Sequence, residues 1–435
     1  MSQYKPYPAY KDSGVEWLGK VPEHWNIERV RQRYHLSNGY PFNSSLFQPE
    51  GEAENRLIRI RDLTPTDAFI YTEEACTDNA LIGNGDVLIG MDGDFNAVLW
   101  NEGRAKLNQR VCALRGATVA QTKYFLYSIP MVLGIINNTA YATTVKHLSS
   151  GEVMSAKLAF PPQKELGKIV EILDRETARI DSLVAAKTRF IELLKEKRQA
   201  LITRAVTKGL DPKVKLKDSG IEWLGQVPEH WQYGRFIYTC QLLVDGTHQS
   251  PESYTEGEYL YITAKNIKEN GFDFSDIAYV KEEDQRQIFP RCPGQKGDVL
   301  YIKDGATAGV AMVNDLEQEF SMLSSVALIR PNVDFLESRF IRYHLNAGGF
   351  KQYVLSQLVG GAITRFTLDV ISRFIIVRPP LNEQITIVTY LDQITARIDA
   401  LITKTQRSIE LLKERRSALI TAAVTGKIDL REASV

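Results

Sequence analysis

The sequence predicts an α+β protein with a pseudo-twofold internal repeat, in which two mixed α/β domains are separated by two long helices that pair as an antiparallel coiled coil. Three observations predict this. A short and a long block of sequence each occur twice, a seven-residue apolar spacing runs through the long block, and the stretches between blocks alternate short apolar runs with turn residues. The 435 residues, 44% of them hydrophobic, are enough for two or three compact domains.

The short block reads KDSGVEWLGKVPEHW at residues 11–25 and KDSGIEWLGQVPEHW at residues 217–231. Thirteen of the fifteen positions are identical, which chance does not explain. Two tryptophans with a proline between them are typical of an aromatic loop that packs against another element. We expect a structural role for His24 and His230 too, because neither has a cysteine or a second histidine at metal-ligand spacing.

The long block covers residues 161–207 and returns at residues 379–425. It has no proline after its first two residues, and its apolar residues recur every seven positions, which predicts a long helix with a coiled-coil seam. Such a seam has to be buried, and the other copy in the same chain is the obvious surface. The predicted seam residues are Leu173, Ile180, Leu183, Leu194, Leu201, Leu391, Ile398, Leu401, Leu412 and Leu419.

Connectivity predicts the direction of the helix pair. Gly209 and Pro212 end the first helix, and the second short block follows within a few residues, so the first helix connects the two mixed domains. A second helix that starts from the far domain and pairs with the first must run antiparallel to it, and about 40 residues span roughly 60 Å. The predicted segments are a first domain at 1–160, a first spacer helix at 161–215, a second domain at 216–378 and a second spacer helix at 379–435.

The two mixed domains share little sequence but do share one landmark. GDVLIGMDG begins at Gly85 and GDVLYIKDG begins at Gly297, and each reads as a strand that ends in a tight Asp-Gly turn. Further β-branched runs at 57–60 and 259–263 also predict strands. We therefore expect similar frameworks that carry different loops.

Composition limits the class of protein. Lys plus Arg and Asp plus Glu both number 53, so an overall basic charge typical of a nucleic-acid binder is absent. The four cysteines lie singly, which indicates buried thiols and predicts neither disulfides nor a metal site. The start has no signal-peptide core, and we expect no apolar run long enough for a membrane span, so the predicted location is the cytoplasm without membrane contact.

The paired SGxEWLGxVPxHW segments and the PP...LD...TARID...IELLKE segments, each in two copies and in fixed order, resemble the specificity subunit of type I restriction-modification systems. The resemblance covers nearly the whole chain. Residues 244–267, VDGTHQSPESYTEGEYLYITAKNI, are similar to the opening of many target-recognition domains of that family. The first domain departs from this pattern, with SNGYPFNSSLF from Ser37.

The resemblance implies that each mixed domain is a target-recognition domain that reads one half of an asymmetric bipartite site in double-stranded DNA. It also implies two methyltransferase subunits and restriction subunits as partners, with S-adenosylmethionine, ATP and magnesium on those partners and no cofactor in this chain. The residues agree with a non-catalytic subunit, because the sequence has neither a P-loop nor the Asn/Asp-Pro-Pro-aromatic motif of adenine methyltransferases.

Candidate DNA contacts lie in glycine-rich loops and at basic strand ends, where a backbone can approach the duplex. Arg59 and Arg61, two apart on an expected strand, should point to one face. The candidates in the first domain are Tyr40, Arg59, Arg61, Asn96, Asn108, Arg110 and Lys146, and those in the second are Thr247, His248, Lys265, Asn266, Lys303, Thr307 and Arg365.

Two other classes of protein fit part of the pattern. A coiled-coil adaptor whose variable domains bind proteins has no DNA specificity of its own and suits the balanced charge. A stand-alone repressor needs enough phosphate contacts to bind DNA tightly without partners. A split asymmetric target explains better than either why two differing domains sit on closely copied scaffolds.

Overall fold

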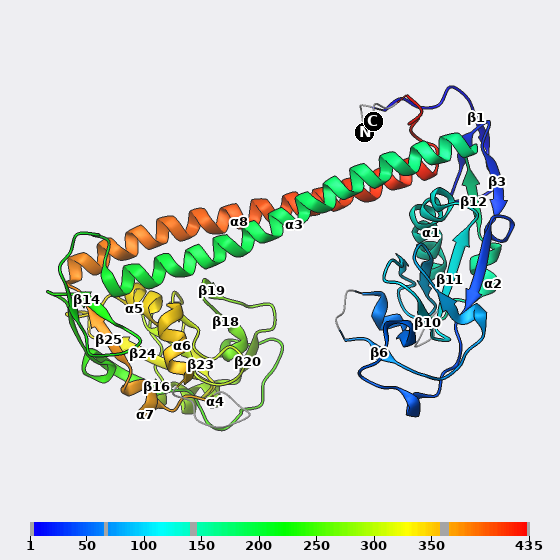
Figure 1. Cartoon of the computed structure of the whole chain (residues 1–435). Helices are drawn as coiled ribbons and strands as arrows, with labels where there is room; N and C mark the ends of the chain where they lie inside the picture. The colour runs from blue at the N-terminus through cyan, green and yellow to red at the C-terminus, as the bar shows by residue number, and fades with distance from the viewer. Residues whose placement is uncertain (1–3, 65–67, 140–145, 357–364, 433–435) are drawn as a thin grey trace. The chain divides into compact units, whose positions relative to one another are not determined.

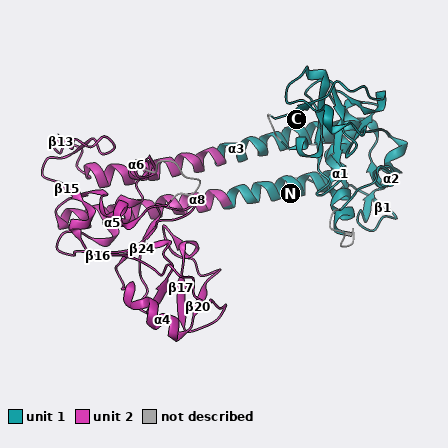
Figure 2. Ribbon diagram, turned by 90° about the horizontal axis from the view of Figure 1, so that it is seen from below, with its two compact units in different colours: residues 1–187, 407–435 teal, residues 188–406 magenta. Residues whose placement is uncertain are grey.

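The computed structural model describes residues 4–64, 68–139, 146–356 and 365–432, and the chain divides into two compact units. Unit 1 consists of residues 1–187 and 407–435, and unit 2 of residues 188–406 (Figure 2). Two long helices, α3 (Gln163–Lys208) and α8 (Leu381–Val424), contribute one segment to each unit. The α+β class, the internal repeat and the two long helices are confirmed, while the four consecutive sequence segments remain a prediction.

Unit 1 is built on a four-stranded sheet with strand order β4-β11-β8-β9, in which every pair is antiparallel. A second four-stranded sheet has the order β6-β5-β10-β7, and the pairs β1-β2 and β12-β3 complete the unit. The strands are β1 (Tyr10–Asp12), β2 (Lys20–Pro22), β3 (Asn26–Arg29), β4 (Tyr34–Asn38), β5 (Arg56–Ile58), β6 (Ile70–Tyr71), β7 (Leu81–Ile82), β8 (Val87–Gly90), β9 (Ala97–Leu99), β10 (Ala105–Leu107), β11 (Val111–Gly116) and β12 (Lys157–Phe160). The shorter helices are α1 (Val119–Thr139) and α2 (Ser150–Ser155).

Unit 2 repeats this layout with the sheet β16-β24-β21-β22 in the same antiparallel arrangement. The sheet β20-β17-β23 and the pairs β13-β14, β15-β25 and β18-β19 surround it. The strands are β13 (Leu216–Asp218), β14 (Gln226–Pro228), β15 (Gln232–Arg235), β16 (Cys240–Asp245), β17 (Tyr259–Ile262), β18 (Ile267–Lys268), β19 (Gly271–Phe272), β20 (Ala278–Val280), β21 (Val299–Ile302), β22 (Ala311–Val313), β23 (Phe320–Met322), β24 (Val326–Pro331) and β25 (Ile375–Arg378). The shorter helices are α4 (Glu282–Ile288), α5 (Ser338–Leu345), α6 (Gly348–Ser356) and α7 (Leu368–Ser372).

The GDVL landmark forms the same internal anchor in both sheets. Asp86, ahead of β8, accepts hydrogen bonds from Nε and Nη2 of Arg115, and Asp298, ahead of β21, does the same for Arg330. These hydrogen bonds raise the pKa of both arginines. A paired guanidinium and carboxylate holds neighbouring strands in register, so the repeated GDVL stretch keeps the two frameworks alike.

Helix α1 corrects one expectation from the sequence. Its stretch Val119–Asn138 is long and apolar enough to cross a membrane by length and composition alone, a criterion that a helix buried in a protein core also meets. The helix packs against β8, β9 and β11, and Tyr124, Phe125 and Ile129 are fully buried in the core of unit 1. Packing on the sheet therefore accounts for its apolar side chains.

The segments of α3 and α8 lie side by side within each unit (Figure 1). In unit 1 an ion pair joins Asp181 of α3 to Arg416 of α8. Glu165 near the start of α3 accepts a hydrogen bond from Trp25, and a Cβ atom on Gly426, just after α8, would lie 3.5 Å from the same ring. In unit 2, Arg198 pairs with Asp399, and a Cβ atom on Gly209, just after α3, would lie 3.2 Å from Glu383 near the start of α8. The predicted antiparallel direction is thus confirmed in both units.

The seam itself is narrower than predicted. Leu173, Ile180, Leu194, Leu391, Ile398 and Leu419 are buried, and Leu201 and Leu412 are half-buried. A second buried column lies four residues further on and includes Thr177, Ile191, Ala205, Thr395 and Ala423. Leu183 and Leu401 are 43% and 46% exposed, so their assignment to the seam is wrong. In a two-helix pair only two columns face the partner, and these two leucines flank the column that does.

Candidate nucleic-acid interface

Three loops of unit 1 meet at one end of the central sheet. Because β11 is antiparallel to both β4 and β8, the end of β4, the start of β11 and the end of β8 share an edge, with Cys112 opposite Asn38 and Val111 opposite Gly90. This edge therefore collects the residues that follow β4 and β8 and those that precede β11. Four of the predicted DNA contacts, Tyr40, Asn96, Asn108 and Arg110, belong to these loops.

Backbone contacts fix the first two loops against each other. The amide of Tyr40 donates to Leu107 O at 2.8 Å, and the amide of Gln109 donates to Tyr40 O at 3.1 Å. A Cβ atom on Gly39 would lie 1.9 Å from the carbonyl oxygen of Asn108, so only glycine permits this approach. The side chains of Tyr40 and Asn108 are half-buried and project from a rigid support.

Asp92, two residues after β8, contacts Arg110 and His147 at this edge. Its carboxylate lies 2.6 Å from Nδ1 of His147 and 3.5 Å from Nη1 of Arg110. Arg110 and His147 remain about half exposed, at 53% and 52% of their side-chain surface. Lys146 instead donates to Asn137 O at 2.7 Å. The edge thus presents the guanidinium of Arg110 and the imidazole of His147 to solvent, and the half-buried carboxylate of Asp92 holds both in place.

Unit 2 carries the equivalent edge with different side chains. The amide of Thr247 donates to Met322 O at 2.8 Å, and a Cβ atom on Gly246 would lie 2.1 Å from that oxygen, so this glycine has the same function as Gly39. Asp304 takes the position of Asp92 in the repeated landmark and pairs with Nε of Arg365 at 3.4 Å. The backbone of Asp92 also forms an antiparallel β-bridge with that of His147, and the backbone of Asp304 forms one with that of Arg365.

Asp245, at the end of β16, forms the densest charge cluster. Its carboxylate lies 3.2 Å from Nε2 of His248, 3.3 Å from Nη2 of Arg291 and 3.3 Å from Nζ of Lys303. His248 and Arg291 are about half exposed, whereas Lys303 is only 2% exposed. Lys303 therefore neutralises the buried carboxylate, while the His248 ring and the Arg291 guanidinium are accessible to solvent.

The expectation for Arg59 and Arg61 needs correction. Strand β5 ends at Ile58, and residues Ile60–Leu63 form a 3₁₀ helix, so the two arginines do not share a strand face. Arg59 is buried and donates to Asp62 from its backbone nitrogen, Nε and Nη2 at 2.8–2.9 Å, which closes the turn. Arg61 is exposed and remains a candidate DNA contact.

The matching turn of unit 2 corrects the expectation for Asn266. This side chain is 2% exposed, accepts from the amide of Thr263 at 3.0 Å and donates to Asp273 O and Asp276 O. It therefore holds its own loop and has no capacity left for DNA. Lys265 is exposed next to it, at the position that Arg61 has in unit 1.

The remaining predicted contacts and several missed residues can be placed on the same edges. Asn96 and Thr307 are exposed in the turns that follow β8 and β21. Sequence analysis missed Asp92, His147, Asp245 and Arg291. Asp92 could have been found from the sequence. It and Asp304 lie two residues after β8 and β21, and no other acidic residue is shared at the same spacing by the two loops that follow these strands.

The short repeated block has the structural role predicted for it. Glu165, in the first turn of α3, accepts from Nε1 of Trp25 at 2.8 Å and from the hydroxyl of Tyr7 at 2.6 Å, and lies 2.8 Å from Nε2 of His24. Glu383, in the first turn of α8, makes the corresponding contacts with Trp231 and His230. Each block thus ties one domain to the N-terminus of a long helix, where a carboxylate is favoured.

Metal and thiol chemistry find no support in the part of the chain that the structure describes. No group of three His, Cys, Asp or Glu side chains there has metal-ligand geometry. Cys112 and Cys292 are buried and Cys76 and Cys240 half-buried, and burial raises the pKa of Cys112, Cys240 and Cys292 to about 12. Thiols of this kind are unreactive.

Comparison with known proteins gives a consistent result. A family model described as the type I restriction modification DNA specificity domain matches residues 22–192 and 245–411. The type I restriction enzyme EcoBI specificity subunit of Escherichia coli is 27% identical over 96% of this chain and 89% of its own length. The EcoKI specificity subunit of Escherichia coli strain K12 is 25% identical over 47% of this chain and 44% of its own length.

Solved structures share the fold. A chain from a study of complex assembly and conformational transition of the type I R-M system superposes with a TM-score of 0.70 at 18% identity, covering 94% of this chain and 99% of its own. The HsdS subunit from Thermoanaerobacter tengcongensis gives a TM-score of 0.50 at 18% identity, with 94% and 98% coverage. The two sheet edges therefore lie in two copies of one domain, and the chain belongs to the type I restriction-modification DNA specificity family.

Proposed function

We propose that this chain is the specificity subunit of a type I restriction-modification complex and that each of its domains reads one half of an asymmetric bipartite DNA target. One observation carries the proposal. The same end of the same sheet bears half-exposed cations and imidazoles in both units, yet the side chains differ, with Arg110 and His147 in unit 1 and His248, Arg291 and Arg365 in unit 2. Equal supports with unequal side chains suit two unlike half-sites.

In this proposal the loops at each edge enter a groove, and the exposed cations contact phosphates and base edges. Tyr40, Asn96, Asn108, Arg110 and Arg61 are the proposed contacts of the first domain, together with Lys146 at its margin. Thr247, His248, Lys265, Thr307 and Arg365 are those of the second. Arg59, Asn266 and Lys303 are buried and hold the loops in position.

The paired helices α3 and α8 would set the number of unread base pairs between the half-sites. The repeated blocks, which change little between the copies, would bind two methyltransferase subunits, and restriction subunits would join that complex. S-adenosylmethionine, ATP and magnesium would be bound by those partners in the cytoplasm. The balanced charge of the chain predicts weak DNA binding alone and tight binding in the complex, whose partners supply further cationic surface.

Selection from a random duplex library tests the proposal. The complex of this chain with its methyltransferase subunits should enrich two short unlike motifs at a fixed separation, with nanomolar affinity. The adaptor alternative predicts no enriched sequence at all. Nanomolar, sequence-selective binding by the isolated chain would support the repressor alternative and contradict the proposed division of labour.

A further inference from the structure

Each unit contains the same contact between a domain helix and a long helix, although the domains themselves have diverged. In unit 1 the hydroxyl of Tyr127 on α1 donates to Asp174 Oδ1 on α3 at 2.7 Å and lies 3.2 Å from Oγ1 of Thr177. In unit 2 the hydroxyl of Tyr343 on α5 donates to Asp392 Oδ1 on α8 at 2.6 Å and lies 3.4 Å from Oγ1 of Thr395.

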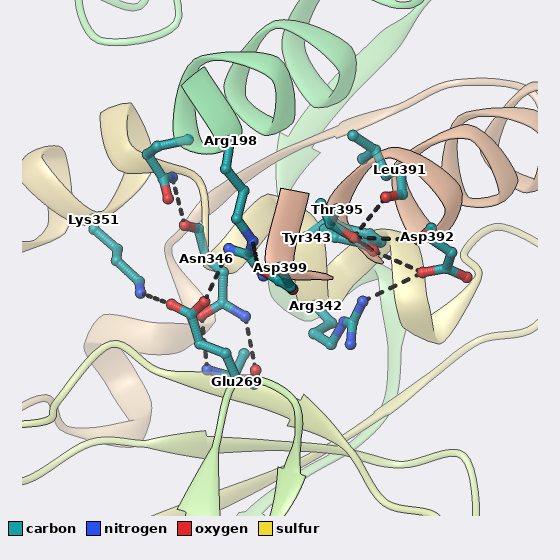
Figure 3. Close-up of polar contacts among 12 residues, drawn as sticks. Arg198, Glu269, Arg342, Tyr343, Asn346, Lys351, Leu391, Asp392, Thr395 and Asp399 are labelled. Carbon is teal, nitrogen blue, oxygen red and sulfur yellow. Dashed lines mark hydrogen bonds and ion pairs between the residues drawn. The ribbon is translucent and has the colours of Figure 1, made fainter. Parts of the chain in front are cut away.

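A cation four residues before each tyrosine completes the contact. Lys123 Nζ lies 2.6 Å from Asp174 Oδ2, and Nη1 of Arg339 lies 3.0 Å from Asp392 Oδ2. Figure 3 shows Tyr343, Arg342 and Thr395 around Asp392 of unit 2. Each aspartate thus accepts a neutral hydrogen bond from the tyrosine and a charged one from the cation four residues before it, and Asp392 accepts a further, longer one from Nη2 of Arg342 at 3.5 Å. Two donors on successive turns define the orientation of that helix as well as its distance.

The threonine connects this contact to the coiled-coil seam. Thr177 Oγ1 donates to Leu173 O at 2.6 Å, and Thr395 Oγ1 donates to Leu391 O at 2.7 Å. Both leucines are fully buried in the seam, and both threonines are nearly so. A shift of the domain helix would therefore act directly on the residues that pack the helix pair.

The face of each long helix that contacts the domain also contacts the other long helix. Seven residues after Asp174, Asp181 pairs with Nε of Arg416 at 2.9 Å, and seven residues after Asp392, Asp399 pairs with Nε of Arg198 at 3.3 Å. Residues seven apart lie on one side of a helix. The repeated stretch LDxxTARID thus joins the domain to one helix and that helix to its partner.

We infer that Tyr127 and Tyr343 are positioning residues, each of which fixes the orientation of its DNA-reading domain on the long helices and so sets how strictly the separation of the half-sites is measured. The inference rests on the proposed function. Divergent domains have no reason in packing alone to keep a tyrosine, a cation and a carboxylate in the same geometry. A recognition subunit that measures a fixed gap does have such a reason.

The test measures binding of DNA duplexes that carry the target selected by the wild-type complex, with its gap at the preferred length and one base pair longer or shorter. Wild type should show a sharp preference for one gap. Tyr343→Phe and Tyr127→Phe each remove one hydroxyl and leave the ion pairs intact, and each should reduce that preference by about tenfold, the loss expected for one hydrogen bond to a carboxylate. The bases selected in both half-sites should remain unchanged.

Tyr238→Phe, at a 75% exposed tyrosine of the same unit, is the matched control and should leave the gap profile unchanged. A tyrosine variant that keeps the wild-type gap preference would overturn the inference. A variant that changes the bases selected would also overturn it, because the tyrosine would then take part in base recognition. A wild-type complex without any preferred gap would overturn the proposed function itself. The two failures are distinguishable, since only the second appears without a mutation.

Discussion

Nζ of Lys303 lies 3.3 Å from Oδ2 of Asp245, and the two side chains are 2% and 5% exposed. A buried charge without a partner is unfavourable, so each of these groups requires the other. The pair lies at the edge of the central sheet of unit 2, and His248 and Arg291 contact the same carboxylate. The positions of His248 and Arg291 at the proposed DNA-reading edge therefore depend on Lys303, whose side chain is itself buried.

Replacing Asp245 with Asn should disrupt that edge. Lys303 would keep only the longer contact to Asp304, at 3.8 Å, and the free energy of unfolding of unit 2 should fall by about 3 kcal/mol. Denaturant unfolding and half-site selection measure the two effects. We expect the second half-site to be lost and the first to be retained. Glu317→Gln, in an exposed pair with Lys296 of the same unit, is the control, and equal effects of both changes would contradict this account.

Arg110→Gln and Arg365→Gln should each weaken one half-site. Both side chains are about half exposed and are held by an aspartate of the repeated landmark. If each contacts a phosphate, its loss should lower the slope of log K against log salt concentration by about one. Titrations of the complex at several salt concentrations measure this slope. Arg286→Gln, in an exposed pair on α4, should not change it. An unchanged slope in both variants would exclude these arginines as phosphate contacts.

The ion pair between Arg198 and Asp399 should contribute to pairing of the long helices. Arg198 is only 16% exposed, and its Nη1 also lies 3.4 Å from Glu269. A double-mutant cycle with Arg198→Gln and Asp399→Asn should give a coupling energy of about 1 kcal/mol in unfolding experiments. The cycle of Arg416 with Asp181 is the internal comparison. A coupling energy near zero in both cycles would show that apolar packing alone sets the pairing.

Stability should depend on pH through His344. The ring is fully buried near Trp223 and Phe350, and burial lowers its pKa from 6.5 to about 4. Between these values the unfolded chain binds a proton that the folded chain does not, so this contribution is complete above pH 6.5 and is lost as the pH falls toward 4. The loss amounts to about 3 kcal/mol at most.

Unfolding of wild type and His344→Leu, measured by tryptophan fluorescence at pH 7 and pH 5, tests this assignment. The variant should lose less stability than wild type between the two pH values, because the carboxylates that titrate in both proteins cancel in the comparison. Parallel losses in the two proteins would assign the acid sensitivity to other groups.

The duplication and the heptad spacing were enough to predict the fold, because both are local and repeat many times. Leu173 and Leu391, the first leucines of the two predicted seams, are fully buried. Leu183 shows the limit of the pattern. Its apolar character predicts burial, but only the geometry of a two-helix pair determines that its column faces away from the partner.

The candidate site was predicted only as a set of loops. Arg59 and Arg110 look equivalent in sequence, yet Arg59 makes three hydrogen bonds to Asp62, whereas Arg110 reaches solvent. Whether a side chain is used within the fold depends on a neighbour brought close by tertiary structure. The tyrosine contact of each domain with its long helix was missed for the same reason, although a cation four residues before a tyrosine is present in both copies.

Helix length offers a further test. Insertion of one heptad at matching positions of α3 and α8 lengthens the pair by about 10 Å, which corresponds to about three base pairs of DNA. The selected target should keep both half-site motifs and gain a longer gap. A constant gap, or changed bases within a half-site, would contradict the spacer role of the helices.

Mapping of methylated bases in the genomic DNA of cells that carry this chain with its methyltransferase subunits tests the central claim most directly. The account predicts one asymmetric motif in two unlike parts with a fixed number of unspecified bases between them, and a change of one part alone when residues 26–160 are exchanged for another domain. A single uninterrupted motif, or a motif in which that exchange alters both parts, would contradict it.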